Sequence, residues 1–600
     1  MKYIFFQLLL LITALCTAQT TTKYKISFKN AAHHEAVVTV EFNNIENKVL
    51  ELRMSRTSPG RYALHEFAKN VYDVKAYDSN GNLLPITRPS PYQWNVLGHN
   101  GNVKITYILF ANRGGGTYSQ VDETHAHLNI PATFMYARAY TQRPIKVTFD
   151  VRNDLHWKVA TQLKHLKNNT YYAPNMYYFM DSPTEISNYS KRSFIVESNG
   201  KEYPINFILH HNGTEAELDT YFEKVKKVVL QEMKVYGELP DYDFGEYTFL
   251  ACYIPNASGD GMEHRNSTSI TSTRSLADGG MDRNISTVSH EYFHSWNVER
   301  IRPMSLEPFD FEKTNMSGEL WFAEGFTSYY TNLILCRAGL ISQQEYIKGL
   351  ASGLNYVWNS PARNYFNPIQ MSYQAPFVDA ARSVDPVNRE NTFISYYTYG
   401  SVLGLALDLS LRNLEGNKNL DDFMKLVWKT YGKTEIPYTV KDLENLLNAY
   451  AGNEFGITFF NNYIFDSKMP DYKSLFASVG VNFEQTQSNE AYVGAYLYFK
   501  NGKCIIMNNP FEGSAAYKAG LDNNDEIISL NDKPVSIAIN SKKYLAQFKP
   551  GQTVKVIFKR LGELKETSLT FDSNPSYKTS INTKASKKEV NKRNLWLLSK

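Results

Sequence analysis

The residues best suited to chemistry are two histidines and a glutamate in the segment SHEYFHSW, where His290, Glu291 and His294 form the pattern HExxH. If the segment is helical, residues four apart lie one turn above each other, so both imidazoles point toward one spot. Two histidines spaced in this way can hold zinc, and the glutamate beside them can act as a base. Ser286 or Thr287 is expected to cap the start of this helix.

A catalytic zinc site takes three protein ligands and keeps a fourth position for water, so one ligand is missing from the pattern. The segment LWFAEGFTSYY supplies Glu324 among apolar and aromatic residues. A carboxylate buried there is costly unless it is paired or binds a metal ion. Glu319 competes for this role, but a charge at a helix start is explained by the helix dipole. The sequence therefore predicts Glu324 as the third ligand of one Zn²⁺ per chain.

The composition excludes some classes of partner. The chain has 600 residues, which is room for about three or four domains. Its 64 basic and 60 acidic residues nearly balance. No nucleic-acid or membrane-surface role follows from this balance, and we expect no nucleic acid as a partner.

The N-terminus has the pattern of a secretory signal peptide over residues 1–18. Lys2 precedes an apolar run from Ile4 to Leu15, and small residues surround a cleavage site after Ala18. The run is short for a membrane span, and no later stretch approaches the required length. We expect the mature chain to be exported, to the periplasm or outside the cell.

The cysteines of the mature chain are Cys252, Cys336 and Cys504. An odd number of distant cysteines does not form a disulfide framework. They are expected to be thiols in the core rather than ligands.

Short alternating runs such as AVVTVEF and VKITYILF, separated by Asn, Gly and Pro, predict an all-β, sandwich-like domain over residues 19–200. Four histidines of this domain have no nearby carboxylates in the sequence, and we expect them at the surface or in turns: His33, His34, His125 and His127.

Residues 201–478 begin with strands and continue with helices, which is typical of an α+β domain. Apolar periodicity predicts a helix at 214–236 and then a series of five. These five lie at 318–337, 343–358, 396–412, 419–431 and 439–450. Residues 485–575 return to short strands, and the Lys- and Ser-rich segment 576–600 is expected to be a flexible basic tail, although Leu595 to Leu598 could dock on the body of the protein.

Three segments together resemble a known family. HEYFHSWNVERIRP, LWFAEGFTSYY and GMEHRNST are similar to motifs of the glycyl aminopeptidases, which are secreted zinc peptidases of the gluzincin group. The resemblance implies a β domain, a thermolysin-like α+β catalytic domain and a C-terminal PDZ domain. For the PDZ domain the most similar segment is AYKAGLDNNDEIISLNDKPV, and its carboxylate-binding loop would lie around Tyr492 to Ala495.

The resemblance also implies roles for individual residues. His290, His294 and Glu324 match zinc ligands, and Glu291 matches the general base. Glu263 matches the carboxylate that receives the free α-ammonium of the substrate.

A tyrosine supports the oxyanion in these relatives, within a Tyr-x-Lys-Gly pattern. Tyr397 aligns with it in SYYTYGSVLGL, but Tyr399 occupies the position of the lysine and Tyr396 is a further candidate. The choice among the three tyrosines stays open.

The predicted function is hydrolysis of the N-terminal residue of peptides by a zinc aminopeptidase, with a preference for small residues such as Gly or Ala. The substrate is then a peptide with a free N-terminus, and the PDZ domain would take a C-terminal peptide ligand. One alternative is a zinc endopeptidase. Another is a PDZ-based peptide-binding protein with a vestigial metal site.

Overall fold

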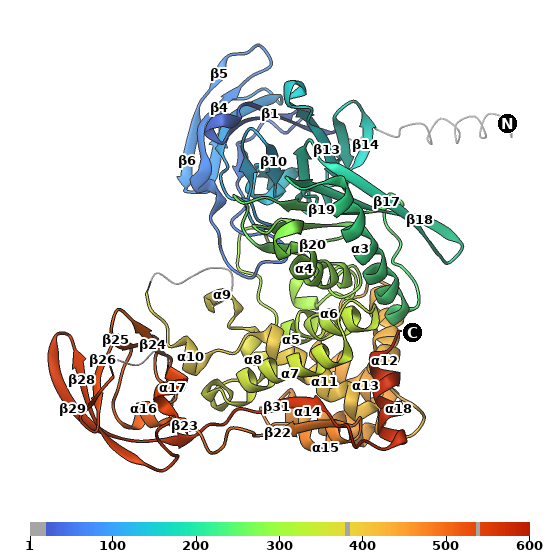
Figure 1. Cartoon of the computed structure of the whole chain (residues 1–600). Helices are drawn as coiled ribbons and strands as arrows, with labels where there is room; N and C mark the ends of the chain where they lie inside the picture. Colours follow the sequence, from blue (N-terminus) through green and yellow to red (C-terminus); the bar gives the residue numbers. More distant parts are fainter. Residues whose placement is uncertain (1–19, 379–384, 536–540, 600) are drawn as a thin grey trace. The chain divides into compact units, whose positions relative to one another are not determined.

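The computed structural model describes residues 20–378, 385–535 and 541–599, so the predicted signal peptide lies outside the described residues. The chain forms two compact units (Figure 1). Unit 1 comprises the chain up to Phe222, Asp241–Asn284 and Asp310–Lys313, and unit 2 comprises Glu223–Pro240, Ile285–Phe309 and Thr314–Lys600.

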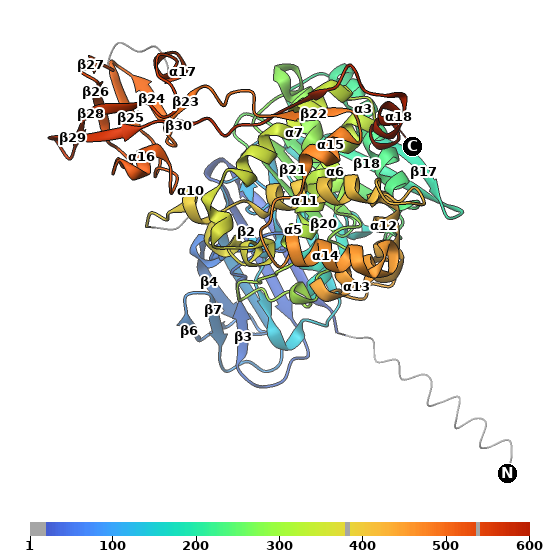
Figure 2. The ribbon, with the colours of Figure 1, turned by 90° about the horizontal axis from the view of Figure 1, so that it is seen from below.

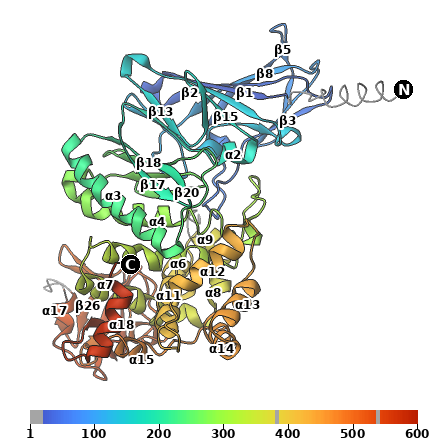
Figure 3. The same ribbon diagram turned by 90° about the vertical axis from the view of Figure 1, so that its right-hand side faces the viewer.

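An eight-stranded sheet forms one layer of unit 1 (Figure 3), with the order β14-β15-β12-β1-β2-β8-β4-β5. Its strands are β1 (Thr22–Asn30), β2 (Glu35–Phe42), β4 (Val71–Tyr77), β5 (Leu83–Leu84), β8 (Val103–Phe110), β12 (Ile145–Asp150), β14 (Lys164–Lys167) and β15 (Thr170–Ala173). Alternate residues of β8 are buried, starting with Val103 and Ile105. This period of two places one face of the strand against the core.

Two four-stranded sheets complete the predicted sandwich-like domain, which is confirmed as the N-terminal β-rich part of a multidomain fold. The first contains β9 (Gln120–Val121), β10 (His125–Leu128), β13 (Lys158–Thr161) and β16 (Thr184–Ser187). The second contains β3 (Leu50–Arg53), β6 (Ile86–Ser90), β7 (Gln93–Val96) and β11 (Tyr136–Ala137). The expectation that His125 and His127 lie at the surface was wrong, because both are buried in β10. Local spacing does not reveal this burial, because His125 and His127 have partners that are distant in sequence, His210 and Glu185.

A five-stranded sheet also belongs to unit 1, with the order β17-β18-β19-β21-β20. Its strands are β17 (Ser190–Ser198), β18 (Lys201–His211), β19 (Tyr247–Tyr253), β20 (Asp260–His264) and β21 (Ser267–Ser272). β17 and β18 pair as one hairpin, so the predicted domain boundary at residue 200 falls in its turn. The change from β-rich to mixed sequence therefore does not coincide with the boundary of the unit.

Unit 2 is mainly helical. Its longer elements are α6 (Gly325–Arg337), α7 (Gln343–Trp358), α11 (Tyr396–Leu411), α12 (Leu420–Val427), α13 (Val440–Ala451) and α14 (Asn453–Tyr463). Shorter helices are α5 (Leu320–Ala323), α8 (Pro368–Ser372), α9 (Ala375–Val378), α10 (Arg389–Thr392) and α15 (Tyr472–Ala477). α11 packs on α5, α6 and α7 (Figure 2). The helix predicted over 318–337 is divided at Glu324 into α5 and α6.

Two helices run from unit 1 into unit 2: α3 (Glu215–Tyr236) and α4 (Met281–Phe293). α4 carries His290 and Glu291 of the HExxH pattern, and His294 follows its last residue. Among the residues that the structure describes, no helix has the length and apolar composition needed to cross a membrane.

The C-terminal β-rich domain contains the sheet β24-β25-β26-β28-β29, with β27 paired to β26 (Figure 2). Its strands are β24 (Leu497–Lys500), β25 (Lys503–Ile506), β26 (Glu526–Leu530), β27 (Lys533–Pro534), β28 (Thr553–Arg560) and β29 (Glu563–Thr570), and its helices are α16 (Ala515–Lys518) and α17 (Ser541–Leu545). Two strand pairs flank it, β22 (Val481–Glu484) with β31 (Lys578–Ile581) and β23 (Ala491–Tyr492) with β30 (Asp572–Ser573). The domain is thus joined to the rest of unit 2 at both ends.

The prediction of a flexible tail from residue 576 was wrong. The segment forms strand β31 and helix α18 (Lys587–Leu597). Trp596 and Leu597 are buried, whereas Leu595 and Leu598 are exposed. The Trp596 indole N–H donates to the Tyr329 hydroxyl at 2.9 Å, and Arg337 donates to the Trp596 carbonyl at 3.0 Å. One large aromatic side chain therefore holds this polar segment on α6.

Candidate metal centre and active site

Helix α4 carries His290 in its last turn, and His294 follows directly after its last residue, Phe293. It begins at Met281, so Ser286 and Thr287 lie inside the helix and neither caps it, contrary to the prediction. The preceding turn is stabilised instead by Ser275, whose side chain accepts a hydrogen bond from the Asp278 N–H. The start of the helix is hard to predict from the sequence because the chain bends just before it, where Asp278 and Gly279 have non-helical backbone angles.

Three ligand atoms converge at one point, and we call the residues that supply them, His290, His294 and Glu324, the helix cluster. The two histidine Nε2 atoms lie 3.1 Å apart. Glu324 Oε2 lies 3.5 Å from Nε2 of His290 and 3.3 Å from Nε2 of His294. Ligand atoms about 2.0–2.1 Å from a tetrahedral zinc ion are about 3.3 Å apart, so this donor set fits zinc.

Hydrogen bonds to the far nitrogens orient both imidazoles. The Thr331 hydroxyl donates to the Thr327 carbonyl at 2.9 Å, so it accepts from His290 Nδ1–H at 3.1 Å. His294 Nδ1–H donates to the Asn297 carbonyl at 2.5 Å. Each Nε2 therefore keeps its lone pair toward the cluster, which is the tautomer that binds a metal.

Glu324 stands at the break between α5 and α6, and two glycines next to it allow a close helix contact. A methyl group on Gly400 of α11 would lie 1.8 Å from the Trp321 carbonyl oxygen, and one on Gly325 would lie 2.4 Å from the Gly400 Cα. Only glycine permits this approach, which brings the start of α11 beside Glu324. The competing Glu319 accepts hydrogen bonds from the hydroxyls of Ser317 and Ser305 at 2.8 and 3.1 Å, and it is not part of the cluster.

The electrostatics of the cluster suit metal binding. Burial lowers the pKa of His290, which keeps its imidazole neutral. Burial opposes ionisation of Glu324, but the adjacent His294 and His290 hold its pKa below the ordinary value. A neutral imidazole and an ionised carboxylate are the states that bind zinc.

Glu291 and Tyr397 lie beside the helix cluster. Glu291 is buried, and one of its carboxylate oxygens is within 4.8 Å of a ring nitrogen of His294. The ring of Tyr397, in the first turn of α11, is 5.8 Å from the ring of His290. Tyr396 packs against Tyr397 at 4.9 Å, whereas Tyr399 packs in the core against Trp358 at 5.9 Å. The ring of Tyr397 is therefore in contact with the helix cluster.

Glu263 belongs to unit 1, where it lies on the edge strand β20. The side chain is buried, and the backbone of Gly60 packs against it. A methyl group on Gly60, which has a φ of +75°, would lie 3.0 Å from Glu263 Oε2. Arg61 forms an ion pair with Asp260 and donates to the Gly261 carbonyl at 3.1 Å. A loop of the N-terminal β domain thus fixes the strand that carries Glu263.

The sequence reasoning missed two residues that hold the helix cluster, Thr331 and Asn297. Thr331 lies seven residues after Glu324 on α6, a spacing that places it on the same helix face. Asn297 follows His294 by three residues, and its amide group donates to the carbonyls of Phe322 and Ala323 at 3.3 and 3.2 Å. Asn297 therefore links the histidine segment to the turn that carries Glu324.

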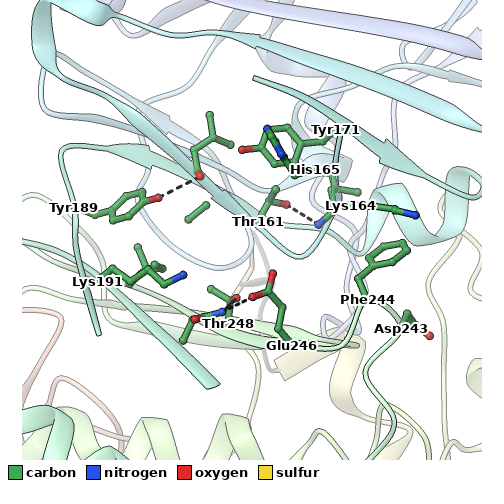
Figure 4. A pocket seen from close by; sticks show the side chains of 15 residues that line it. Thr161, Lys164, His165, Tyr171, Tyr189, Lys191, Asp243, Phe244, Glu246 and Thr248 are labelled. Carbon is green, nitrogen blue, oxygen red and sulfur yellow. Dashed lines mark hydrogen bonds between the residues drawn. The ribbon is translucent and has the colours of Figure 1, made fainter. Parts of the chain in front are cut away.

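A separate cavity of about 570 Å³ lies in unit 1. Charges of both signs line it, including Lys164 and Lys191 as well as Asp243 and Glu246 (Figure 4). Asn206 donates to Glu246 Oε2 at 2.8 Å. None of the predicted site residues lines this cavity, so its size alone does not make it the active site.

The C-terminal β-rich domain has its own cavity, of about 420 Å³. One wall is the predicted carboxylate-binding loop, with Tyr492, Val493 and Ala495, and another contains Leu545 and Phe548. An apolar cavity beside a short strand is suited to an extended peptide.

Comparison with known proteins confirms the resemblance seen in the sequence. Residues 23–188 match the peptidase M61 N-terminal domain, residues 283–403 match M61 glycyl aminopeptidase, and residues 477–571 match the PDZ domain. No match was found among curated proteins.

Solved structures include similar folds. An aminopeptidase N family protein from Idiomarina loihiensis is 24% identical with a TM-score of 0.83, and the match covers 96% of this chain and 100% of that one. An M1 zinc metallopeptidase from Deinococcus radiodurans is 12% identical with a TM-score of 0.41, and the match covers 74% of this chain and 92% of that one. The first similarity shows the shared multidomain fold. The family matches identify the protein as a peptidase of the aminopeptidase type.

Proposed function

We propose that the protein is a zinc-dependent aminopeptidase that removes the N-terminal residue of peptides and prefers small residues such as Gly or Ala. The observation that carries the proposal is the convergence of two Nε2 atoms and one carboxylate oxygen at 3.1–3.5 Å. The description of the matched family, glycyl aminopeptidase, supports the preference for small residues.

When bound by His290, His294 and Glu324, zinc supplies Lewis acidity toward a water molecule and toward the scissile carbonyl. Glu291 takes the proton of the attacking water and passes it to the leaving amine. The Tyr397 hydroxyl donates a hydrogen bond to the carbonyl oxygen as that oxygen gains negative charge. Thr331 and Asn297 act as positioning residues, because they fix the tautomers of the two histidines.

Glu263 is assigned to the α-ammonium group of the substrate. The support for this role is the family motif and the buried, fixed position of the carboxylate on β20. A carboxylate that pairs with the free ammonium group of a peptide positions the first peptide bond at the reactive centre. It therefore favours removal of single residues over internal cleavage.

The proposal includes export of the protein to the periplasm or the medium, on the basis of the signal-like residues 1–18. It also assigns a C-terminal peptide ligand to the cavity of the PDZ domain. Fractionation of cells, with mass spectrometry of the mature N-terminus, tests the first point. The expected mature protein begins at Gln19, and an intact Met1 in the cytoplasmic fraction would contradict export.

The decisive experiment combines zinc analysis with hydrolysis of a panel of aminoacyl amides on the same preparation. We expect Gly and Ala amides to be hydrolysed fastest, with Glu291→Ala inactive. N-acetylated peptides serve as the control for the role of Glu263. Undiminished cleavage of the acetylated peptides would identify an endopeptidase instead, and an inactive, zinc-free wild type would leave only peptide binding.

A further inference from the structure

Four side chains with metal-binding atoms meet inside unit 1, and the proposed mechanism uses none of them. They are His125 of β10, Glu185 of β16, His210 of β18 and Cys252 of β19, and we call them the strand cluster. β10 and β16 are neighbours in a four-stranded sheet. His210 and Cys252 face each other in register on the parallel pair β18 and β19. Each sheet thus supplies two of the four groups.

All four side chains are buried, with exposed fractions of 0% for His125 and Glu185, 1% for Cys252 and 8% for His210. Such complete exclusion from solvent is unusual for two imidazoles, a carboxylate and a thiol in one cluster. Buried polar groups are normally paired by hydrogen bonds, and buried charges are paired or bind metal ions.

The four donor atoms are spaced as the ligands of one ion. Nδ1 of His125 lies 2.9 Å from Nδ1 of His210. Cys252 Sγ is 3.3 Å from His210 Nδ1 and 3.5 Å from His125 Nδ1, and Glu185 Oε1 is 3.8 Å from His210 Nδ1. Zinc–nitrogen distances of about 2.0–2.1 Å and zinc–sulfur distances of about 2.3 Å place tetrahedral ligands about 3.3–3.6 Å apart. The observed distances between donor atoms run from 2.9 to 3.8 Å and so include this range.

The surrounding hydrogen bonds direct lone pairs toward the centre of the cluster. The side-chain oxygen of Gln120 accepts from His125 Nε2–H at 3.1 Å, which leaves Nδ1 of His125 unprotonated. Glu185 Oε2 accepts from His127 Nδ1–H at 3.0 Å, and Ser269 contacts the other nitrogen of His127 at 3.0 Å. These contacts hold the first ligands from outside, as outer-shell groups do in metal sites.

Glu185 Oε1 is the clearest sign of a missing partner. Within the described part of the chain, no group donates a hydrogen bond to this atom, although it is fully buried and faces the other three donors. An unpaired buried carboxylate oxygen is costly, and a cation in the centre would satisfy it.

We propose that His125, Glu185, His210 and Cys252 bind a structural zinc ion, in addition to the ion of the helix cluster. Two imidazoles and one thiolate favour zinc over magnesium or calcium, which prefer oxygen ligands. Four protein ligands close the coordination sphere, so this ion has no position for substrate. On binding, the Cys252 thiol releases one proton to solvent, and a bond between sulfur and zinc replaces its S–H bond.

The role of such an ion follows from the strands that it joins. His125 and Glu185 come from the N-terminal β domain, whereas His210 and Cys252 come from the five-stranded sheet that precedes the HExxH helix. The ion would fasten these two sheets within unit 1. It would stabilise the unit without taking part in peptide hydrolysis, so the inference stands independently of the proposed function.

The test is metal analysis of the full-length protein purified without chelators, with Glu324→Ala, Cys252→Ala and Cys504→Ala as variants. We expect two zinc ions per chain in the wild type and in Cys504→Ala, which removes a buried thiol of the C-terminal β-rich domain that belongs to neither cluster. Each of the other two variants should retain one ion. The sequence alone predicts one ion per chain, so the stoichiometry separates the two views.

Cobalt substitution identifies the thiolate directly. With Co²⁺ in place of zinc, we expect a sulfur-to-cobalt charge-transfer band in the wild type and in Glu324→Ala, and its absence in Cys252→Ala. A wild type with one zinc ion, a Glu324→Ala variant with none and no sulfur band in either would overturn the proposal. The wild-type and Glu324→Ala spectra decide the question even if Cys252→Ala fails to fold. An intensely blue copper protein would overturn the choice of zinc.

Discussion

The helix cluster and the strand cluster both contain two histidines and a glutamate, but they differ in the number of ligands and in exposure to solvent. The helix cluster offers three ligands, and the side chain of His290 is 17% exposed. The strand cluster offers four ligands, including a thiol, and its Glu185 and Cys252 are buried completely or nearly so. Three ligands leave a coordination position for chemistry, whereas four close the site. We therefore assign the helix cluster to reaction and the strand cluster to stability, although their donor sets are related.

The outer contacts of the two clusters differ as well. The histidines of the helix cluster are held by a threonine hydroxyl and a backbone carbonyl of neighbouring segments. The strand cluster is held by side chains of Gln120 and His127, which come from the same sheet as two of its ligands. The difference teaches that the helix cluster is oriented in part by the backbone, whereas the strand cluster depends on further side chains of its own sheet.

The largest expected effect separates metal binding from chemistry in the helix cluster. Glu291→Gln keeps the shape of the side chain but cannot accept a proton. We expect kcat to fall by about 10²–10⁴-fold, because general base catalysis is lost. Zinc content should stay at the wild-type value. Loss of an ion from this variant would mean that Glu291 is a ligand, and the count of three ligands would be wrong.

Tyr397→Phe should have the next largest effect. Loss of one hydroxyl that stabilises the oxyanion lowers kcat by about 10²–10³-fold. Tyr399→Phe is the matched control, because its ring packs against Trp358. Steady-state kinetics on an alanine amide measures both. Equal rates for the two variants would remove Tyr397 from the reactive site.

A smaller effect is expected from Thr331→Val, which removes the acceptor for His290 Nδ1–H. Loss of such an outer contact weakens metal binding by about 10–100-fold. Activity should fall at limiting zinc and recover when zinc is added. Thr434→Val is the control, since the Thr434 hydroxyl also donates to a carbonyl four residues earlier, that of Thr430, at 2.6 Å. Failure of zinc to restore activity would argue against a positioning role.

The smallest expected effect concerns the strand cluster. His127→Gln removes the imidazole that donates to Glu185, so retention of the second ion should weaken by about 10–100-fold. The corresponding loss of stability lowers the unfolding temperature by about 3–10 °C. Calorimetry with and without added zinc measures it. A shift that added zinc does not reduce would show that His127 acts through packing alone.

The helix cluster was readable from the sequence because its ligands are local. His290 and His294 are one helical turn apart, and a carboxylate in an apolar helix signals a binding partner. The same spacing rule places Thr331 on the helix face of Glu324, although Thr331 was not predicted. The sequence did not show which tyrosine lies beside the cluster. Tyr397 and Tyr399 differ by about 200° around a helix, and only the packing of α11 fixes which one faces His290.

The strand cluster could not be read from the sequence. Its ligands are spread from residue 125 to residue 252 over four strands, and only the pairing of the strands brings them together. The Lys- and Ser-rich composition of the C-terminal segment gave no indication that it forms a strand and a helix. One local signal was present there, because Ser586 and Glu589 have the spacing of a capping box and form one.

Helix α18 ties the completion of unit 2 to a late stage of synthesis. Domains fold as units, and those nearer the N-terminus fold first while the chain is being made. All residues of unit 1 have been synthesised once Lys313 has been added. In unit 2, however, Tyr329 and Arg337 lack their hydrogen-bond partner Trp596 until the end of the chain is made. The helices around the catalytic site therefore reach their final packing only after the PDZ domain has been synthesised, so an incomplete chain remains an unfinished peptidase.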